Sequence, residues 1–177
     1  MNNNQTPHRL NIRMIISLIL VVVAIGVWSL YLSKDDTPSA ADNSRALIGG
    51  AFELTNHKNE MVSDKDFLGK YMIVYFGYTY CPDVCPMDLQ IMTDSMHHLP
   101  QEIANKVTPV FVTIDPERDT VEVMAEYVQY FHEDLVGLTG TLEQINTIKK
   151  AYRVYAAKAD ETEDYLVDHT AYTYLMD

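Results

Sequence analysis

Cysteine is scarce in this chain, whose 177 residues include only two, Cys81 and Cys85. So few thiols exclude a scaffold held by several disulfides, and a structural zinc site would lack a second cysteine pair. Basic residues are also few, 13 against 25 acidic ones, which gives a net charge of −12. This balance argues against binding to nucleic acid or to an anionic lipid surface. The rest of the composition is that of one globular domain with an appendage.

Charge is absent from residues 14–32, MIISLILVVVAIGVWSLYL. As a helix, this stretch would measure about 28 Å, close to the hydrocarbon thickness of a bilayer. Arg9 and Arg13 precede it and Lys34 follows it with two aspartates, so the positive-inside rule places residues 1–13 in the cytoplasm. A cleaved signal peptide would have a shorter apolar core with a small-residue site directly behind it, and a lipoprotein would have a cysteine there. We therefore expect an uncleaved, single-pass transmembrane signal anchor.

Residues 33–48, SKDDTPSAADNSRALI, are polar and small and follow no period. They are typical of a flexible tether with an end-to-end distance of roughly 20–25 Å. The domain at residues 49–177 would then lie close to the outer face of the membrane. Residues 1–13 are rich in asparagine and lack the Arg/Ser amphipathic character of a transit peptide. We expect a bacterial inner membrane, with the domain in the periplasm.

Strand and helix patterns alternate along residues 49–177 and predict an α/β domain with a largely parallel centre. Continuous apolar runs at 71–77 and 107–115 predict two strands that are buried on both faces. A third strand is expected at 170–176. No strand or helix pattern follows to cover its outer edge, so the domain is expected to be shortened or to depend on a partner.

Two helices of this domain carry capping-box patterns at their predicted first turns. Asp119 would pair with Glu122 in DTVE, and Thr141 would pair with Gln144 in TLEQ. Helical spacing predicts that both helices bury apolar side chains against the sheet. The positions expected to face the core are Val121, Met124, Ala125, Val128, Phe131, Leu142, Ile145 and Tyr152.

The two cysteines stand in YFGYTYCPDVCPMDL, residues 75–89, and each comes directly before a proline. Because a residue before proline avoids the α region, residues 81–85 are not expected to form regular helix. Cys85 is expected at the N-cap of the next helix, with Pro86 at the first helical position and Cys81 in the preceding loop. Free N–H groups at such a helix end would lower the pKa of the thiols.

Three kinds of site can use two thiols at this spacing. A disulfide across so short a loop would add only about 2 kcal/mol of stability, which makes a structural staple the weakest of them. A redox couple at a strand-to-helix junction would resemble thioredoxin, whose motif usually has two intervening residues rather than three. A Cu(I) site would need two thiolates and one imidazole. His169, at the mouth of the last strand, is the candidate third ligand, and the residues alone leave the redox couple and the copper site open.

GGAFELT, VYFGYTYCPDVCP, TIDPERDT, GLTG and YLVDHT occur here in the order and spacing of the Sco/SenC proteins, from about Gly49 to Asp177. The resemblance implies a membrane-anchored, thioredoxin-like copper protein. The family's metal ligands fall on Cys81, Cys85 and His169, which would hold Cu(I) or Cu(II), and its acidic loop matches residues 115–119 as supporting structure. Similar proteins continue past YLMD, so a C-terminal strand and helix are expected to be missing here.

The resemblance also implies a function, that of a copper metallochaperone in cytochrome c oxidase assembly. Its partner would be the oxidase subunit that carries the dinuclear copper site, with other copper chaperones or thiol reductants as further partners. The alternative is a thiol–disulfide reductase, in which Cys81 and Cys85 are the catalytic redox pair and act on the cysteines of that site or of other exported proteins. We expect substitution of His169 to abolish copper binding but to leave thiol exchange intact.

Overall fold

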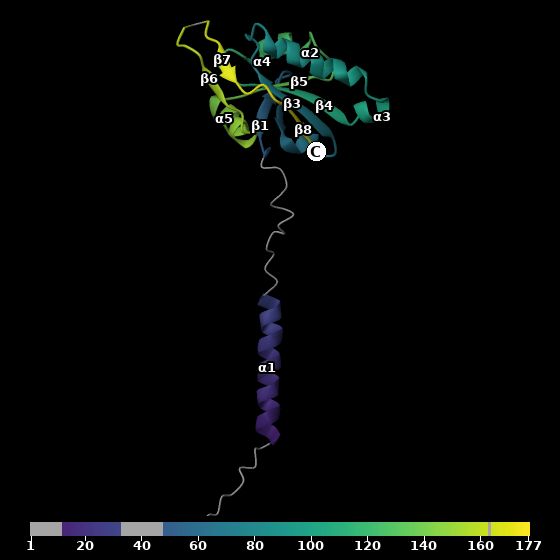
Figure 1. Cartoon of the computed structure of the whole chain (residues 1–177), viewed down its shortest axis with the longest axis vertical. Helices are drawn as coiled ribbons and strands as arrows, with labels where there is room; N and C mark the ends of the chain where they lie inside the picture. The colour runs from purple at the N-terminus through teal and green to yellow at the C-terminus, as the bar shows by residue number, and fades with distance from the viewer. Residues whose placement is uncertain (1–11, 33–47, 163) are drawn as a thin grey trace, which may run out of the picture. The chain divides into compact units, whose positions relative to one another are not determined.

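The computed structural model describes residues 12–32, 48–162 and 164–177 (Figure 1). The chain divides into two units, residues 1–45 and residues 46–177. The first unit contains the helix α1 (Ile12–Leu32), whose described side chains are exposed and, apart from Ser17, apolar. No helix in the described part of the chain combines the length and the apolarity needed to cross a membrane. The predicted tether lies outside the described residues, apart from its last position.

The second unit alternates strands and helices, as predicted. Its strands are β1 (Glu53–Asn56), β2 (Met61–Ser63), β3 (Tyr71–Gly77), β4 (Val107–Thr113), β5 (Val136–Thr139), β6 (Ala156–Lys158), β7 (Val167–His169) and β8 (Thr173–Met176). Its helices are the 3-10 helix η1 (Asp64–Phe67) and the α-helices α2 (Val84–His97), α3 (Gln101–Ala104), α4 (Val121–Val128) and α5 (Leu142–Ala151).

One six-stranded sheet, in the order β2-β1-β5-β4-β3-β8, organises this unit. Its three central strands, β5, β4 and β3, are parallel, and the outer pairings are antiparallel. The predicted strands at 71–77 and 107–115 are thus confirmed as the centre of the sheet, although the second ends at Thr113. Figure 1 shows β6 and β7 as a separate hairpin beside this sheet. The prediction of an α/β domain with a parallel centre is confirmed.

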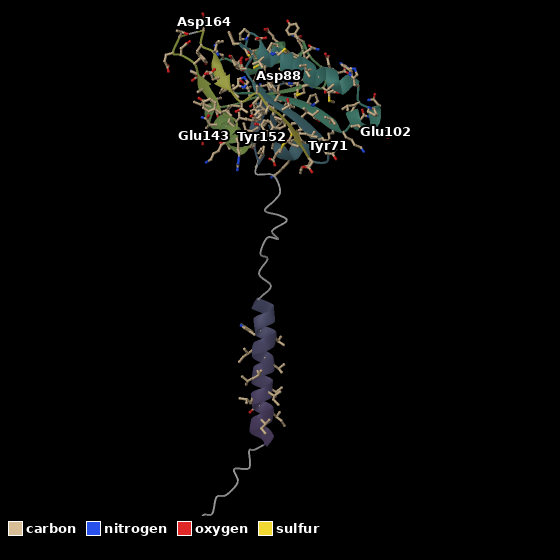
Figure 2. The ribbon with its side chains drawn as sticks, in the orientation of Figure 1. Tyr71, Asp88, Glu102, Glu143, Tyr152 and Asp164 are labelled. Carbon is tan, nitrogen blue, oxygen red and sulfur yellow. The ribbon has the colours of Figure 1, made fainter. Side chains whose placement is uncertain are left out.

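The strand predicted at 170–176 is confirmed in part, because it is limited to Thr173–Met176 and a separate short strand precedes it. Residues 167–169 form β7, which pairs with β6, and Thr173–Met176 form β8, which pairs antiparallel with β3 at the edge of the large sheet. Aromatic packing fixes β8 there, because Tyr174 meets the rings of Phe76 and Tyr152 edge-to-face, at centroid distances of 5.8 and 5.6 Å. Figure 2 labels Tyr152, which follows α5. His169 is therefore held by the hairpin and not by the large sheet.

One predicted capping box is confirmed and the other is wrong. Thr141 and Gln144 cap α5 reciprocally, through bonds of 2.8 and 3.2 Å. The N-cap of α4 is Thr120, because the carboxylate of Asp119 turns inward to other donors.

Most of the predicted inward positions of these helices are buried or half-buried, and one is wrong. Leu142 is exposed, since it opens the first turn of α5 on the outer side. The fully buried members of the set are Met124, Val128, Ile145 and Tyr152, and the half-buried ones are Val121, Ala125 and Phe131.

Candidate metal centre

The cysteine loop leads from the end of β3 into α2. The helix begins at Val84, behind Asp83, so Cys85 is its second residue and not the N-cap that the sequence predicted. Pro86 is tolerated as the third residue because the first four N–H groups of a helix have no partner within it. The N–H of Cys85 points to Sγ of Cys81 at 3.4 Å, and this contact closes the loop. Cys81 lies in the loop, as predicted.

Both cysteines are free and buried, and Cys85 is fully enclosed. Burial raises the pKa of the Cys85 thiol to about 12, although the backbone N–H of Tyr78 acts in the opposite direction. The predicted lowering of the pKa is therefore wrong for Cys85. Removing the sulfur from water disfavours the thiolate more than the N–H groups near the helix end favour it.

Gly77 makes the space that the sulfur of Cys85 occupies. A Cβ at this position would lie 2.9 Å from Sγ of Cys85 and 3.1 Å from the ring of Phe111. The sequence reasoning did not single out this residue. A glycine inside a buried strand is a signal for close approach, and it could have been found at the end of YMIVYFG.

His169 reaches Cys85 from the hairpin. Its Nε2 lies 3.4 Å from Sγ of Cys85, and its Nδ1 lies 3.1 Å from the carbonyl oxygen of Thr170. A carbonyl oxygen only accepts, so this contact assigns the ring proton to Nδ1 and directs the Nε2 lone pair at the sulfur. This tautomer is the one that binds a metal through Nε2.

Two tyrosines enclose the imidazole of His169. The rings of Tyr75 and Tyr78 meet it edge-to-face, at centroid distances of 6.4 and 5.9 Å. The hydroxyl of Tyr78 also accepts a hydrogen bond of 3.1 Å from the N–H of Val167, two residues before the histidine. Tyr78 thus fixes both the ring and the strand that carries it, a role that the sequence reasoning missed.

The structure brings the three predicted site residues together from a loop, a helix and a hairpin. Cys81 contacts Cys85, and Cys85 contacts His169, although 84 positions separate the last two along the chain. Within the described residues, no group of three His, Cys, Asp or Glu side chains has the arrangement of a ready-made metal site.

Asp119 is hydrogen-bonded to the segment that precedes the cysteine loop. Its buried carboxylate accepts hydrogen bonds from the N–H and the hydroxyl of Thr79, at 3.1 and 2.6 Å, and from the hydroxyl of Thr113 at 2.6 Å. Burial raises the pKa of this carboxyl even though these hydrogen bonds favour its charged form. Asp119 therefore joins the end of β4 to the segment that leads to Cys81.

Asp115 connects the same acidic loop to the hairpin. One carboxylate oxygen pairs with Nε of Arg118 at 2.6 Å, and the other accepts from the hydroxyl of Tyr165 at 2.7 Å. The guanidinium lies 3.6 Å above the ring of Tyr165 and 4.7 Å from that of Tyr80, which precedes Cys81. Cation–π and ionic contacts thus hold both flanks of the site. Supporting structure was predicted for residues 115–119, but these tyrosine partners were not.

The model of the SCO1/SenC family matches residues 40–177. This chain belongs to the SCO1/SenC family. It is 49% identical over 140 residues to Protein SCO1 homolog, mitochondrial, of Homo sapiens, which covers 75% of this chain and 45% of that protein. A similar relative is Protein SCO1 homolog 1, mitochondrial, of Arabidopsis thaliana, at 44% over 146 residues, 82% of this chain and 43% of that protein. This family member spans about half the length of the curated relatives that it matches.

Solved Sco structures share its fold. The structure of Bradyrhizobium japonicum ScoI with copper bound has 43% identity and a TM-score of 0.70, over 73% of this chain and 83% of that one. Yeast Sco1 with copper bound has 38% identity and a TM-score of 0.67, over 73% and 74%. The domain therefore has the thioredoxin-like α/β fold of Sco proteins, as the sequence resemblance implied.

Proposed function

We propose that this SCO1/SenC protein is a copper chaperone that holds copper on Cys81, Cys85 and His169. The observation that carries the proposal is the convergence of the free Nε2 of the histidine on the sulfur of Cys85, at 3.4 Å. Two sulfurs and one imidazole nitrogen suit Cu(I), a soft ion. The copper-bound relatives from Bradyrhizobium japonicum and yeast support the same cargo.

Loading and release follow from the protonation of these ligands. The Cys85 thiol loses its proton when a copper–sulfur bond forms, whereas an imidazole with its proton on Nδ1 can bind through Nε2 without losing one. The acceptor in this proposal is the cytochrome c oxidase subunit with the dinuclear copper site, reached by ligand exchange. Other copper chaperones or thiol reductants would supply the copper or keep the two sulfurs reduced.

We further propose that residues 14–32 anchor the protein in a bacterial inner membrane, with residues 1–13 in the cytoplasm and the domain in the periplasm. The support is the sequence itself, which has no charge in this stretch and two arginines before it. A domain tethered there would act close to a membrane-bound partner.

Thiol–disulfide reduction is the second candidate, because two free cysteines lie in contact at the end of a strand. The burial of Cys85 weighs against this residue as the attacking thiol, since attack requires an accessible thiolate. A reductase would therefore have to begin its reaction at Cys81.

Replacing His169 by alanine separates the two functions. In the reduced full chain, we expect His169→Ala to weaken Cu(I) binding by more than about 100-fold, since even an outer-shell partner is worth 10–100-fold. X-ray absorption at the copper edge should show the loss of a nitrogen ligand. His98→Ala is the matched control, because His98 lies just past the far end of α2 and bonds only a backbone carbonyl. Unchanged copper affinity in His169→Ala, with thiol exchange intact, would favour the reductase.

A further inference from the structure

Two histidines from different segments lie side by side at the end of α2 that is opposite the cysteines. His97 is the last residue of α2, and His132 lies in the loop between α4 and β5. Their ring centroids are 4.9 Å apart, and the two ring planes are inclined by 40°. The twelve positions from Cys85 to His97 correspond to about 18 Å along the helix axis. The pair is therefore separate from the candidate metal centre.

The spacing of the two rings fits a shared metal ion. A metal bound to an imidazole nitrogen at about 2.0–2.1 Å lies about 3.2 Å from the centre of that ring. Two rings bound to one ion, at an angle between about 90° and the tetrahedral value, would have centroids about 4.5–5.2 Å apart. The observed 4.9 Å lies within this range. The tilt of 40° also distinguishes the pair from a parallel offset stack.

The position of His132 is fixed by the fold. Its side chain is 10% exposed, and the N–H of Leu135 donates to its carbonyl oxygen at 3.0 Å, which closes the turn that carries it. The buried side chain of Leu135 anchors this turn in the core. His97 is exposed, so the open positions of an ion between the rings would face solvent. Because one of the two ligands is already held in place, little side-chain entropy is lost when an ion binds.

The second ring nitrogen of His132 has a partner whether or not a metal is bound. The N–H of Asp134 donates to Nδ1 of His132 at 3.1 Å, so without a metal the proton of the neutral ring lies on Nε2. When a metal takes Nε2, that proton moves through solvent to Nδ1, and the ring gains and loses no proton overall. The carboxylate of Asp134, 4.0 Å from Nδ1, is then placed to accept it, as carboxylates commonly do behind a metal-bound histidine.

The charges along the two segments favour a cation. Glu133 and Asp134 directly follow His132, and Asp94 lies three residues before His97, on the same side of α2. Residues 84–98 and 121–139, which form these segments, contain no lysine or arginine. An ion between the rings would therefore be attracted by carboxylates of both segments and repelled by no cation of either.

We propose that His97 and His132 form a second metal site, at which two imidazoles bind one divalent transition-metal ion. Imidazole nitrogen suits Zn(II), Ni(II) and Cu(II), and Cu(II) is generally bound most tightly. No third His, Cys, Asp or Glu within the described residues completes a ready-made site, so water fills the remaining positions. The inference is independent of the proposed copper function, because the site uses neither cysteine.

The test uses Ni(II) as the probe, because Ni(II) binds imidazole and is not reduced by free thiols. The reduced full chain, with its six histidine rings labelled with carbon-13, is titrated at buffered free Ni(II) concentrations and followed by NMR. We expect the ring signals of His97 and His132 to broaden together, with one common midpoint. Each signal is assigned by its loss in the corresponding variant.

Single substitutions then show whether the two rings share one ion. His97→Ala should raise the free Ni(II) needed to broaden His132 by at least about tenfold, since even an outer-shell partner is worth 10–100-fold. His132→Asn should have the same effect on His97, and its side-chain oxygen keeps an acceptor for the N–H of Asp134. Because His97 is exposed, His97→Ala is decisive even if His132→Asn does not fold.

His98→Ala is the matched control. His98 is the next residue along the chain, is also exposed, and its ring bonds only a backbone carbonyl. We expect the midpoint for His97 and His132 to be unchanged in this variant. Two rings that only pack against each other would bind Ni(II) independently, so an unchanged midpoint for His132 in His97→Ala would overturn the proposal. An equal loss in His98→Ala would overturn it as well.

Discussion

Two buried polar regions meet at the cysteine loop and differ in how well they are paired. Below the loop, the carboxylate of Asp119 takes three hydrogen bonds from Thr79 and Thr113. On the other side, the sulfur of Cys85 lies 3.4 Å from Nε2 of His169, and the hydroxyl of Tyr75 has no hydrogen-bond partner of normal geometry among the described residues. Polar groups that are fully hydrogen-bonded without a ligand stabilise the fold. Polar groups that lack partners in a close-packed interior are suited to bind a ligand.

The largest effect is expected when the fully hydrogen-bonded carboxylate of Asp119 is removed. Asp119→Ala leaves the N–H and hydroxyl of Thr79 and the hydroxyl of Thr113 without their acceptor, so we expect a loss of about 3 kcal/mol in the free energy of unfolding. Urea denaturation of the copper-free chain measures it. Asp94→Ala, which removes an exposed carboxylate that bonds only a glutamine side chain, should stay within about 0.5 kcal/mol. Equal losses in the two variants would contradict the comparison.

The next largest effect is expected in the pH dependence of copper binding at Cys85. Burial raises the pKa of Cys85 to about 12, so this thiol is protonated in the free protein throughout the range from about pH 6 to 8. Copper must displace that proton, and the apparent Cu(I) affinity should therefore increase with pH, by about tenfold per pH unit from Cys85 alone. Chelator competition at several pH values across this range checks the slope. A flat profile would show that Cys85 is already a thiolate or is not a ligand.

The smallest effect concerns the contact between the acidic loop and the hairpin. Tyr165→Phe keeps the ring under Arg118 but removes the hydrogen bond to Asp115, so we expect a loss of about 1 kcal/mol in stability. The hairpin that presents His169 would be held less firmly, and copper affinity should fall by about threefold, equivalent to less than about 1 kcal/mol. Tyr155→Phe, on an exposed side chain at the base of the same hairpin, should change neither quantity. An effect of Tyr155→Phe as large as that of Tyr165→Phe would argue against the contact.

The central strands of the sheet and one helix cap could be predicted from local sequence patterns. The apolar runs around Val74 and Val110 are too long and continuous for half-exposed strands, and both proved central. The capping pattern at Thr141 was read correctly because its partner lies three residues away. The same pattern misled at Asp119, because donors from distant segments compete for that carboxylate. Local patterns fail where tertiary contacts offer a better partner.

The sequence by itself determined the candidate ligands, which are the sulfurs of Cys81 and Cys85 and the imidazole of His169, just before the last predicted strand. Only the tertiary structure decided that Cys85 and His169 touch, that Nε2 carries the free lone pair, and that the hydroxyl of Tyr75 has no hydrogen-bond partner of normal geometry within the described part of the chain. It also decided the direction of the pKa shift of Cys85. The reason is that desolvation and hydrogen bonding depend on which atoms surround a group, and here those atoms come from segments far apart in the chain.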